Sequence, residues 1–229
     1  MKRFVIPAIV LFASVAHGED ATISIEALKS QTAGKEVCEA ACTACKNCPI
    51  QAAMDELPKF TFQVGKETTC CPDAAAKLAK EHDAPMKYVV GKKSFATKNV
   101  AMVALADATE KYVANFVKPH TCEESGKTTV AGKELCCEVM AGQRAKIAAD
   151  AMAKVTMSYL VGEESCDCPT HATTLAKSSG KEKFFVVGKE KTCCSTTARL
   201  TLARAKYKAA IEALVKADAP KTAETTAKS

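Results

Sequence analysis

The sequence contains no tryptophan among its 229 residues, and aromatic residues make up only 5% of the chain. Because aromatic rings supply much of the buried area in most cores, we expect a thin core of alanine, valine, leucine and methionine. The composition excludes collagen-like and coiled-coil proteins, and no segment is long and apolar enough for a membrane span. The net charge of +6 is mild, and the lysines are not interleaved with aromatic residues, so nucleic acid is not an expected partner.

Patterns typical of enzymes are also scarce. The chain has four histidines, no glycine-rich phosphate-binding loop and no paired-carboxylate motif. With so few histidines, a Ser-His-Asp or Cys-His catalytic arrangement has little support, so we do not expect an enzyme.

The N-terminus has the pattern of a secretory signal peptide. Lys2 and Arg3 precede an apolar run over residues 4–15, and small residues at Ala16 and Gly18 allow cleavage after Gly18. The sequence thus predicts a signal peptide over residues 1–18 and export to the periplasm or the extracellular space. The first cysteine is Cys38, far from the cleavage point, so a lipid anchor is not expected.

The chain repeats itself after an offset of 97 residues. Residues 64–108 match residues 161–205 without a gap at 17 of 45 positions, and residues 33–38 match residues 131–136 at an offset of 98. This self-similarity predicts a tandem duplication with copy one at 19–118 and copy two at 119–216. Residues 217–229 are rich in alanine, lysine and threonine and are expected to form a disordered tail.

Each copy is predicted to contain three units, in which a β-hairpin is followed by a helix. In the best-defined unit, Phe60, Phe62 and Val64 alternate with polar residues, as in a strand with one buried face. Gly65 suits the first central position of a two-residue type II′ turn, and Pro72 suits the first position of a helix. The expected fold class is α+β, with longer helices closing the copies at about 99–117 and 195–216.

Cysteine is the residue type that stands out. There are 13, an odd number, so they cannot all pair within one monomer, and Cys122 in the linker is the candidate for the unpaired thiol. Pro72 and Pro169 place Cys71 and Cys168 near helix N-caps, and by register Cys137 and Cys194 should lie similarly. Helix N–H groups and the helix dipole lower the pKa of a thiol there, which favours the thiolate that binds metals.

Two clusters are the strongest candidates for metal binding. Cys166, Cys168 and His171 lie at one predicted helix start, while Cys38, Cys42, Cys45 and Cys48 would form one stripe on a helix. A mixed Cys and His set suits Zn²⁺, and sulfur alone suits Cu(I). The full set of candidate metal ligands is Cys38, Cys42, Cys45, Cys48, Cys70, Cys71, Cys136, Cys137, Cys166, Cys168, His171, Cys193 and Cys194.

A short part of copy one resembles heavy-metal knuckles of the YHS/TRASH type. Cys48-Pro49-Ile50, the hairpin around Gly65-Lys66, and Cys70-Cys71 before an alanine-rich helix carry this resemblance over about 35 residues. In those knuckles the cysteines at the helix start are separated, whereas here they are adjacent. The resemblance implies metal binding or metal sensing without catalysis.

Two other functions remain open. The cysteines could form a disulfide-braced repeat scaffold that binds a protein partner, because exported proteins commonly form disulfides. Alternatively, the CxxC spacings of Cys42, Cys45 and Cys48 could serve a thiol–disulfide oxidoreductase, although no βαβ pattern surrounds them.

Overall fold

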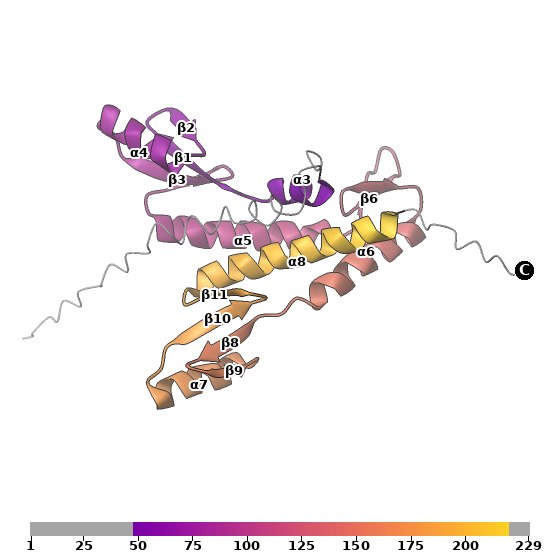
Figure 1. The fold of residues 1–229 in the computed structure, drawn as a ribbon. Helices are drawn as coiled ribbons and strands as arrows, with labels where there is room; N and C mark the ends of the chain where they lie inside the picture. The colour runs from indigo at the N-terminus through magenta and orange to yellow at the C-terminus, as the bar shows by residue number, and fades with distance from the viewer. Residues whose placement is uncertain (1–47, 220–229) are drawn as a thin grey trace, which may run out of the picture. The chain divides into compact units, whose positions relative to one another are not determined.

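The computed structural model describes residues 48–219, which form a mixed α/β structure. Within this part there are six helices and three antiparallel sheets (Figure 1). The predicted signal peptide, the candidate ligands Cys38, Cys42 and Cys45, and most of the predicted tail lie outside the described residues. The five glycine-turned hairpins in residues 48–219 are each followed directly by a helix, as the sequence predicts.

The first sheet is formed by two hairpins, and each hairpin is followed in the sequence by a helix. Its strand order is β2-β1-β3-β4, and β1 pairs antiparallel with β3 over its whole length. Gly65 has a φ of +59° at the first loop position, which supports the predicted type II′ turn. The elements are α3 (Pro49–Asp55), β1 (Phe60–Val64), β2 (Glu67–Thr69), α4 (Pro72–Glu81), β3 (Met86–Val90), β4 (Lys93–Phe95) and α5 (Lys98–Phe116).

The second four-stranded sheet has the same topology. Its order β11-β10-β8-β9 is that of the first sheet read from the other edge, with two hairpins again joined through their first strands. The chain order hairpin, helix, hairpin, helix is also the same, which is what the predicted duplication requires; the duplication itself stays a prediction. The elements are β8 (Ser158–Val161), β9 (Glu164–Cys166), α7 (Pro169–Ser179), β10 (Lys183–Val187), β11 (Glu190–Thr192) and α8 (Ser195–Asp218).

A smaller, three-stranded sheet lies between these regions in the sequence. It has the order β5-β6-β7, from strands β5 (His120–Thr121), β6 (Thr128–Val130) and β7 (Lys133–Leu135), and is followed by α6 (Glu138–Ala153). Its hairpin turn differs from the others because Ala131 and Gly132 both have positive φ, +48° and +72°. Two positive φ values are typical of a type I′ turn, and alanine is strained in this conformation.

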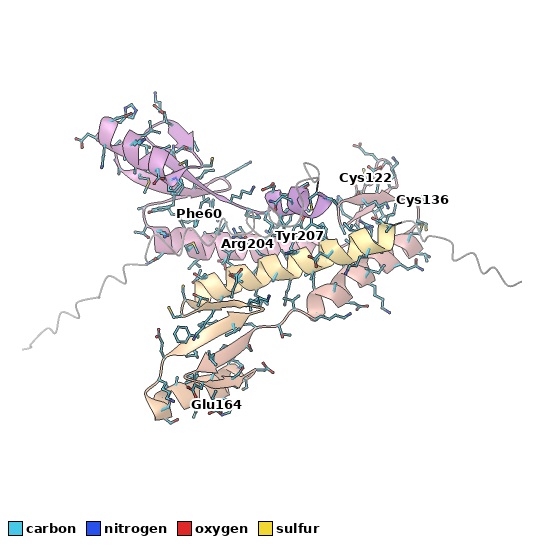
Figure 2. The ribbon with its side chains drawn as sticks, viewed as in Figure 1. Phe60, Cys122, Cys136, Glu164, Arg204 and Tyr207 are labelled. Carbon is cyan, nitrogen blue, oxygen red and sulfur yellow. The ribbon has the colours of Figure 1, made fainter. Side chains whose placement is uncertain are left out.

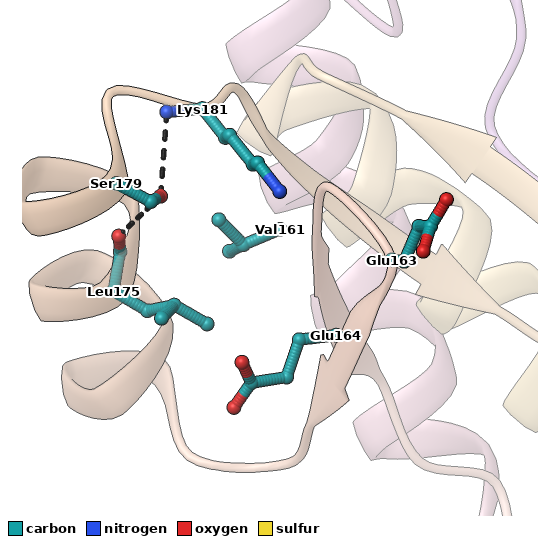
Figure 3. Close-up of a pocket in the computed structure, with 6 residues that line it drawn as sticks. All are labelled: Val161, Glu163, Glu164, Leu175, Ser179 and Lys181. Carbon is teal, nitrogen blue, oxygen red and sulfur yellow. Dashed lines mark hydrogen bonds between the residues drawn. The ribbon is translucent and has the colours of Figure 1, made fainter.

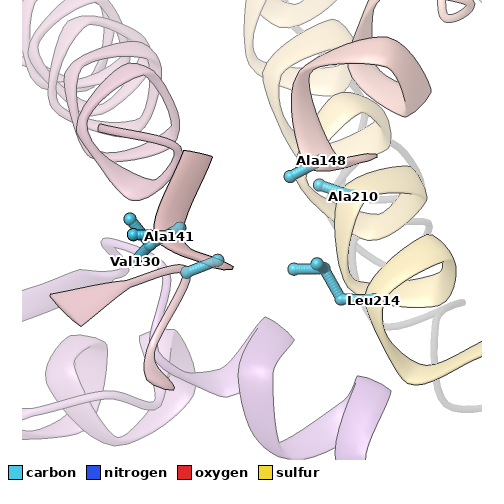
Figure 4. Packing of buried hydrophobic residues seen from close by; sticks show 6 residues of the cluster. Val130, Ala141, Ala148, Ala210 and Leu214 are labelled. Carbon is cyan, nitrogen blue, oxygen red and sulfur yellow. The ribbon is translucent and has the colours of Figure 1, made fainter. Parts of the chain in front are cut away.

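Helix α8 is the centre of the core. It packs against both α5 and α6, and α3 also contacts it. Where α6 packs on α8 and on the β6 hairpin, the buried side chains are aliphatic, as expected from the composition: Val130, Ala131, Ala141, Ala148, Ala210 and Leu214 (Figure 4).

The expectation of a core without aromatic residues is wrong at three places, because Phe62, Tyr159 and Tyr207 are all buried. Tyr207 is fully buried, and its ring lies 4.8 Å from that of Phe116 and 5.6 Å from that of Tyr112 between ring centroids. Tyr112 also donates a hydrogen bond to the Glu56 carboxylate at 3.0 Å. The few aromatic residues thus form small groups, one where α5 meets α8 and one within each four-stranded sheet.

Charged side chains hold α8 at both ends. Arg199 near its start binds the carboxylates of Asp107 and Glu110 on α5, at 2.7 and 2.6 Å. Near its end, both carboxylate oxygens of Asp218 accept hydrogen bonds from Nη1 of Arg144, and one of them also accepts from Lys133. The helix therefore continues to Asp218, two residues past the predicted end. No helix in residues 48–219 is long and apolar enough to cross a membrane.

Candidate functional site

Cysteine occupies the N-cap of five of the six described helices. The predicted N-cap positions of Cys71, Cys168, Cys137 and Cys194 are confirmed, and all four residues have extended backbone angles. The sixth helix, α5, begins after Thr97. A repeated thiol is therefore placed beside the exposed N–H groups of successive helix starts.

Cys48 is a fifth N-cap, which the sequence analysis missed. It precedes α3, with Pro49 at the first helical position. The spacing of Cys48 from Cys45 suggested a place on a helical stripe, yet the Cys-Pro pair is the same signal that correctly placed Cys71 and Cys168.

Two of these N-cap thiols have a lowered pKa. For Cys168 the main cause is the backbone N–H of His171, followed by that of Thr170. For Cys194 burial alone would raise the pKa, but hydrogen bonds from the hydroxyl and N–H groups of Thr197 and Thr196 together outweigh it and lower the pKa. Both thiols are thereby shifted toward the thiolate, the form that binds metal ions.

At three junctions, the residue two positions before the N-cap turns its side chain back toward the cap. The hydroxyl oxygens of Thr69 and Thr192 each accept a hydrogen bond from the backbone N–H of the cap residue two positions later, at 3.2 Å. Cys166 occupies the same position before α7, and its thiol donates to the carbonyl oxygen of Cys168 over 3.9 Å. At this junction alone among those described, the turned-back side chain is a thiol.

Cys122 has a local environment that the sequence analysis did not predict. It starts a tight turn in which its N–H donates to the Lys127 carbonyl and its own carbonyl accepts from the Gly126 N–H, both at 2.9 Å. The Ser125 hydroxyl, followed by the N–H groups of Ser125 and Glu124, lowers the pKa of the exposed Cys122 thiol. The signal in the sequence was the Ser-Gly pair that follows the cysteine at the distance of a turn.

The candidate ligands are spread along the surface and not gathered around one point. All ten cysteines of residues 48–219 carry free thiols, and seven of them are exposed, among them Cys122 and Cys136 (Figure 2). Nowhere in this part of the chain do three His, Cys, Asp or Glu side chains come together as ligands for one ion. His171 thus adds no third ligand to Cys166 and Cys168, and metal binding by the predicted set stays a prediction.

An open hollow of about 440 Å³ lies between α7 and the hairpin of β8 and β9 (Figure 3). Its lining includes Glu164, Leu175 and Lys181. Ser179 also lines it, and its hydroxyl accepts a hydrogen bond from the Lys181 N–H and donates one to the Leu175 carbonyl. No thiol or imidazole lines it. Apart from Cys122 in its turn, the thiols of the described chain therefore lie at or next to helix starts and not in this hollow.

Comparison of the chain with protein-family models, with curated protein sequences and with solved structures finds no match. The site must therefore be interpreted from its own chemistry.

Proposed function

We propose that the protein is an exported, cysteine-rich repeat protein that binds soft or borderline metal ions through clustered thiolates. The observation that carries this proposal is the recurrence of cysteine at helix N-caps, in most cases with a second cysteine one or two positions earlier. Copper(I) and zinc are the ions whose preference for thiolate matches this donor set.

The comparison of N-caps supports a chemical role for the thiols. Cysteine is not among the residues that cap helices well, since serine, threonine, aspartate and asparagine are preferred. Helix α5 begins at Thr97 with the same extended cap geometry, so the hairpin–helix junction forms without a thiol. Five cysteine caps in a chain that can use threonine are therefore better explained by the chemistry of sulfur than by helix initiation.

The duplication belongs to the same proposal. We infer that copy one and copy two arose from one metal-binding ancestor, and the matching strand orders of the two four-stranded sheets support this inference. Repetition multiplies the surface thiols without requiring a cavity, which suits a protein that offers sulfur ligands at several separate places.

The decisive experiment uses mature protein purified from its native compartment without added metal. Mass spectrometry after alkylation counts the free thiols, and elemental analysis of the same sample counts bound copper and zinc. The proposal predicts several alkylatable thiols after metal removal, together with copper or zinc at a level comparable to the protein. Absence of both metals, with all but one thiol resistant to alkylation, would contradict it.

That contrary result would instead support a disulfide-braced scaffold for a protein partner. Such a scaffold predicts a large loss of stability on reduction and no bound metal. A thiol–disulfide oxidoreductase would instead reduce insulin, and Cys42→Ser or Cys45→Ser would abolish that activity.

A further inference from the structure

The junction between β9 and α7 differs from the other cysteine-bearing junctions in the spacing of its thiols. Cys166 and Cys168 are separated by Asp167, whereas the pairs before α4, α6 and α8 are adjacent in sequence. This difference of one residue decides whether the two sulfurs of a pair can converge.

Adjacent cysteines at these junctions are poorly placed to hold one ion together. The cap residues Cys71, Cys137 and Cys194 all have extended backbone angles. Neighbouring side chains in extended backbone point to opposite sides, so we expect the cysteine before each extended cap to be directed away from the cap thiol. Each adjacent pair therefore presents two separate single thiols.

Like threonine at the matching positions, Cys166 contacts the backbone of the cap residue, although it contacts the carbonyl oxygen and not the N–H. Thr69 and Thr192, at the same distance before their caps, both contact the cap residue's backbone at 3.2 Å. The Cys166 thiol contacts the backbone of Cys168 in turn, at 3.9 Å. At three junctions a side chain at this position thus lies against the backbone of the cap residue, and only here, among the described junctions, is that side chain a thiol.

We propose that Cys166 and Cys168 form a two-thiolate chelate for one monovalent soft ion of the Cu(I) class. This inference rests on the proposed function and makes it specific. Binding forms two sulfur–copper bonds, releases one proton from each thiol and leaves the oxidation state of copper unchanged. Zinc is a poorer match because it requires four ligands, and residues 48–219 supply no third ligand at this point.

The test exchanges residues between matching junctions. Cys166→Thr installs the residue that the α4 and α8 junctions already carry, so the hairpin and helix are expected to fold unchanged. Cys70→Asp is the matched control, because it removes one thiol from an adjacent pair and installs the residue found at position 167. Thr69→Cys does the reverse and places a second sulfur beside the Cys71 cap.

Reduced full-length chains are titrated anaerobically with Cu(I) against a chromogenic Cu(I) chelator, and circular dichroism checks the fold of each variant. We expect Cys166→Thr to lose the tightest-bound Cu(I), Cys70→Asp to retain it, and Thr69→Cys to gain one further tightly bound Cu(I). X-ray absorption of the wild-type chain with one Cu(I) bound should show two sulfur neighbours.

The outcomes separate this inference from the function on which it rests. If the wild-type chain binds no Cu(I) more tightly than the chelator does, copper is not the ion of the proposed function and the chelate is also wrong. If the wild type binds Cu(I) but folded Cys166→Thr binds it equally, the chelate is wrong and the broader proposal stands. Stronger retention of zinc than of Cu(I) by the Cys166 and Cys168 pair would also overturn the chelate.

Discussion

The regions around the two four-stranded sheets share their topology but differ in the chemistry at matching positions. Both sheets join two hairpins through their first strands, and both carry glycine at the start of each hairpin turn. At the last junction, however, Cys193 and Cys194 stand where the first region has Ala96 and Thr97. Both junctions begin a helix, so a hairpin–helix junction of this kind folds with or without thiols.

The two regions also differ in how their long helices are buried. Leu200 on α8 is only 2% exposed and packs with Val90, Leu105 and Ala106, all from the first region. Val103 occupies the matching position on α5, at the offset of 97, and is 42% exposed. Equivalent sequence positions therefore have unequal burial, because α8 alone is packed between α5 and α6.

The largest effect is expected from a matched pair of truncations at these two positions. Leu200→Ala should destabilise the fold by about 2–4 kcal/mol, because it removes a fully buried side chain and leaves a cavity. Val103→Ala should change stability by no more than about 0.5 kcal/mol, as for most surface substitutions. Chemical denaturation of both variants measures the difference. Equal losses would show that α5 and α8 are buried alike.

Turn conformation gives the next effect. Gly65 has a φ of +59° with open space where a Cβ would lie, so Gly65→Ala should cost about 1–2 kcal/mol through backbone strain alone. Ala131 already bears such strain at a φ of +48°. Ala131→Gly should stabilise the fold by about 0.5 kcal/mol, since strain relief exceeds the entropy cost of glycine.

Thermal melts of the two turn variants should move in opposite directions. A loss of stability in Ala131→Gly would indicate that the contacts of this turn hold alanine without strain. Such contacts exist: the Ala131 N–H donates to the Phe116 carbonyl at 3.0 Å, and Arg144 donates to the Ala131 carbonyl at 3.5 Å.

The parts of the fold that the sequence predicted depend on local signals. Glycine at the turns and proline after Cys71 and Cys168 determine the conformation of their own neighbours, so hairpins and N-caps could be placed residue by residue. Local signals say nothing about how β1 pairs with β3, or why α8 is central, because those contacts join distant segments. The aromatic cluster at Tyr207 was missed for the same reason, because the composition gives the number of aromatic residues but not where the fold brings them together.

The candidate site also has parts that local signals predict and parts that depend on contacts in the folded chain. Position 166 could be recognised as a metal-ligand candidate from its cysteine alone. Its orientation became evident only by comparison with Thr69 and Thr192, whose hydroxyls show where a side chain at this place points. The cap thiols were likewise predictable, whereas their separation along the surface depends on long-range packing.

A smaller effect is expected at the C-terminal end of α8, which has 24 residues whereas α5 has 19. Burial raises the pKa of Asp218, but hydrogen bonds from Lys133 and Arg144 outweigh it and lower the pKa below its ordinary value of 3.8. The ionised carboxylate therefore contributes stability above that value, and the contribution is lost as pH falls through the lower, folded pKa. The Asp218 side chain is 40% exposed, so solvent screening limits the effect to less than about 1 kcal/mol.

Denaturation of wild type and Asp218→Asn at a series of pH values tests this contribution. The asparagine variant should be less stable at neutral pH and should approach the wild type under acidic conditions, below the ordinary pKa of 3.8. A constant difference across that range would show that Asp218 contributes through its shape and not its charge.

The smallest expected effect concerns the reactivity of the Cys168 thiol. Because N–H groups of His171 and Thr170 lower the pKa of Cys168, its alkylation should rise at lower pH in the folded chain than in denaturant. A variant that keeps Cys168 and replaces the other cysteines by serine isolates this rate. An unchanged pH dependence on unfolding would show that the helix start does not activate the thiol.

The matched control for Cys168 is the cap of α5, where the first region has no thiol. Thr97→Cys, in a chain whose native cysteines are all replaced by serine, places a single thiol at this extended cap. If the helix start is what activates a thiol, the thiol introduced at position 97 should show a pKa shift in the same direction as that of Cys168. A shift at Cys168 without one at position 97 would instead locate the cause in the particular side chains of α7, because the two positions share the backbone geometry of an N-cap and differ in the residues that follow it.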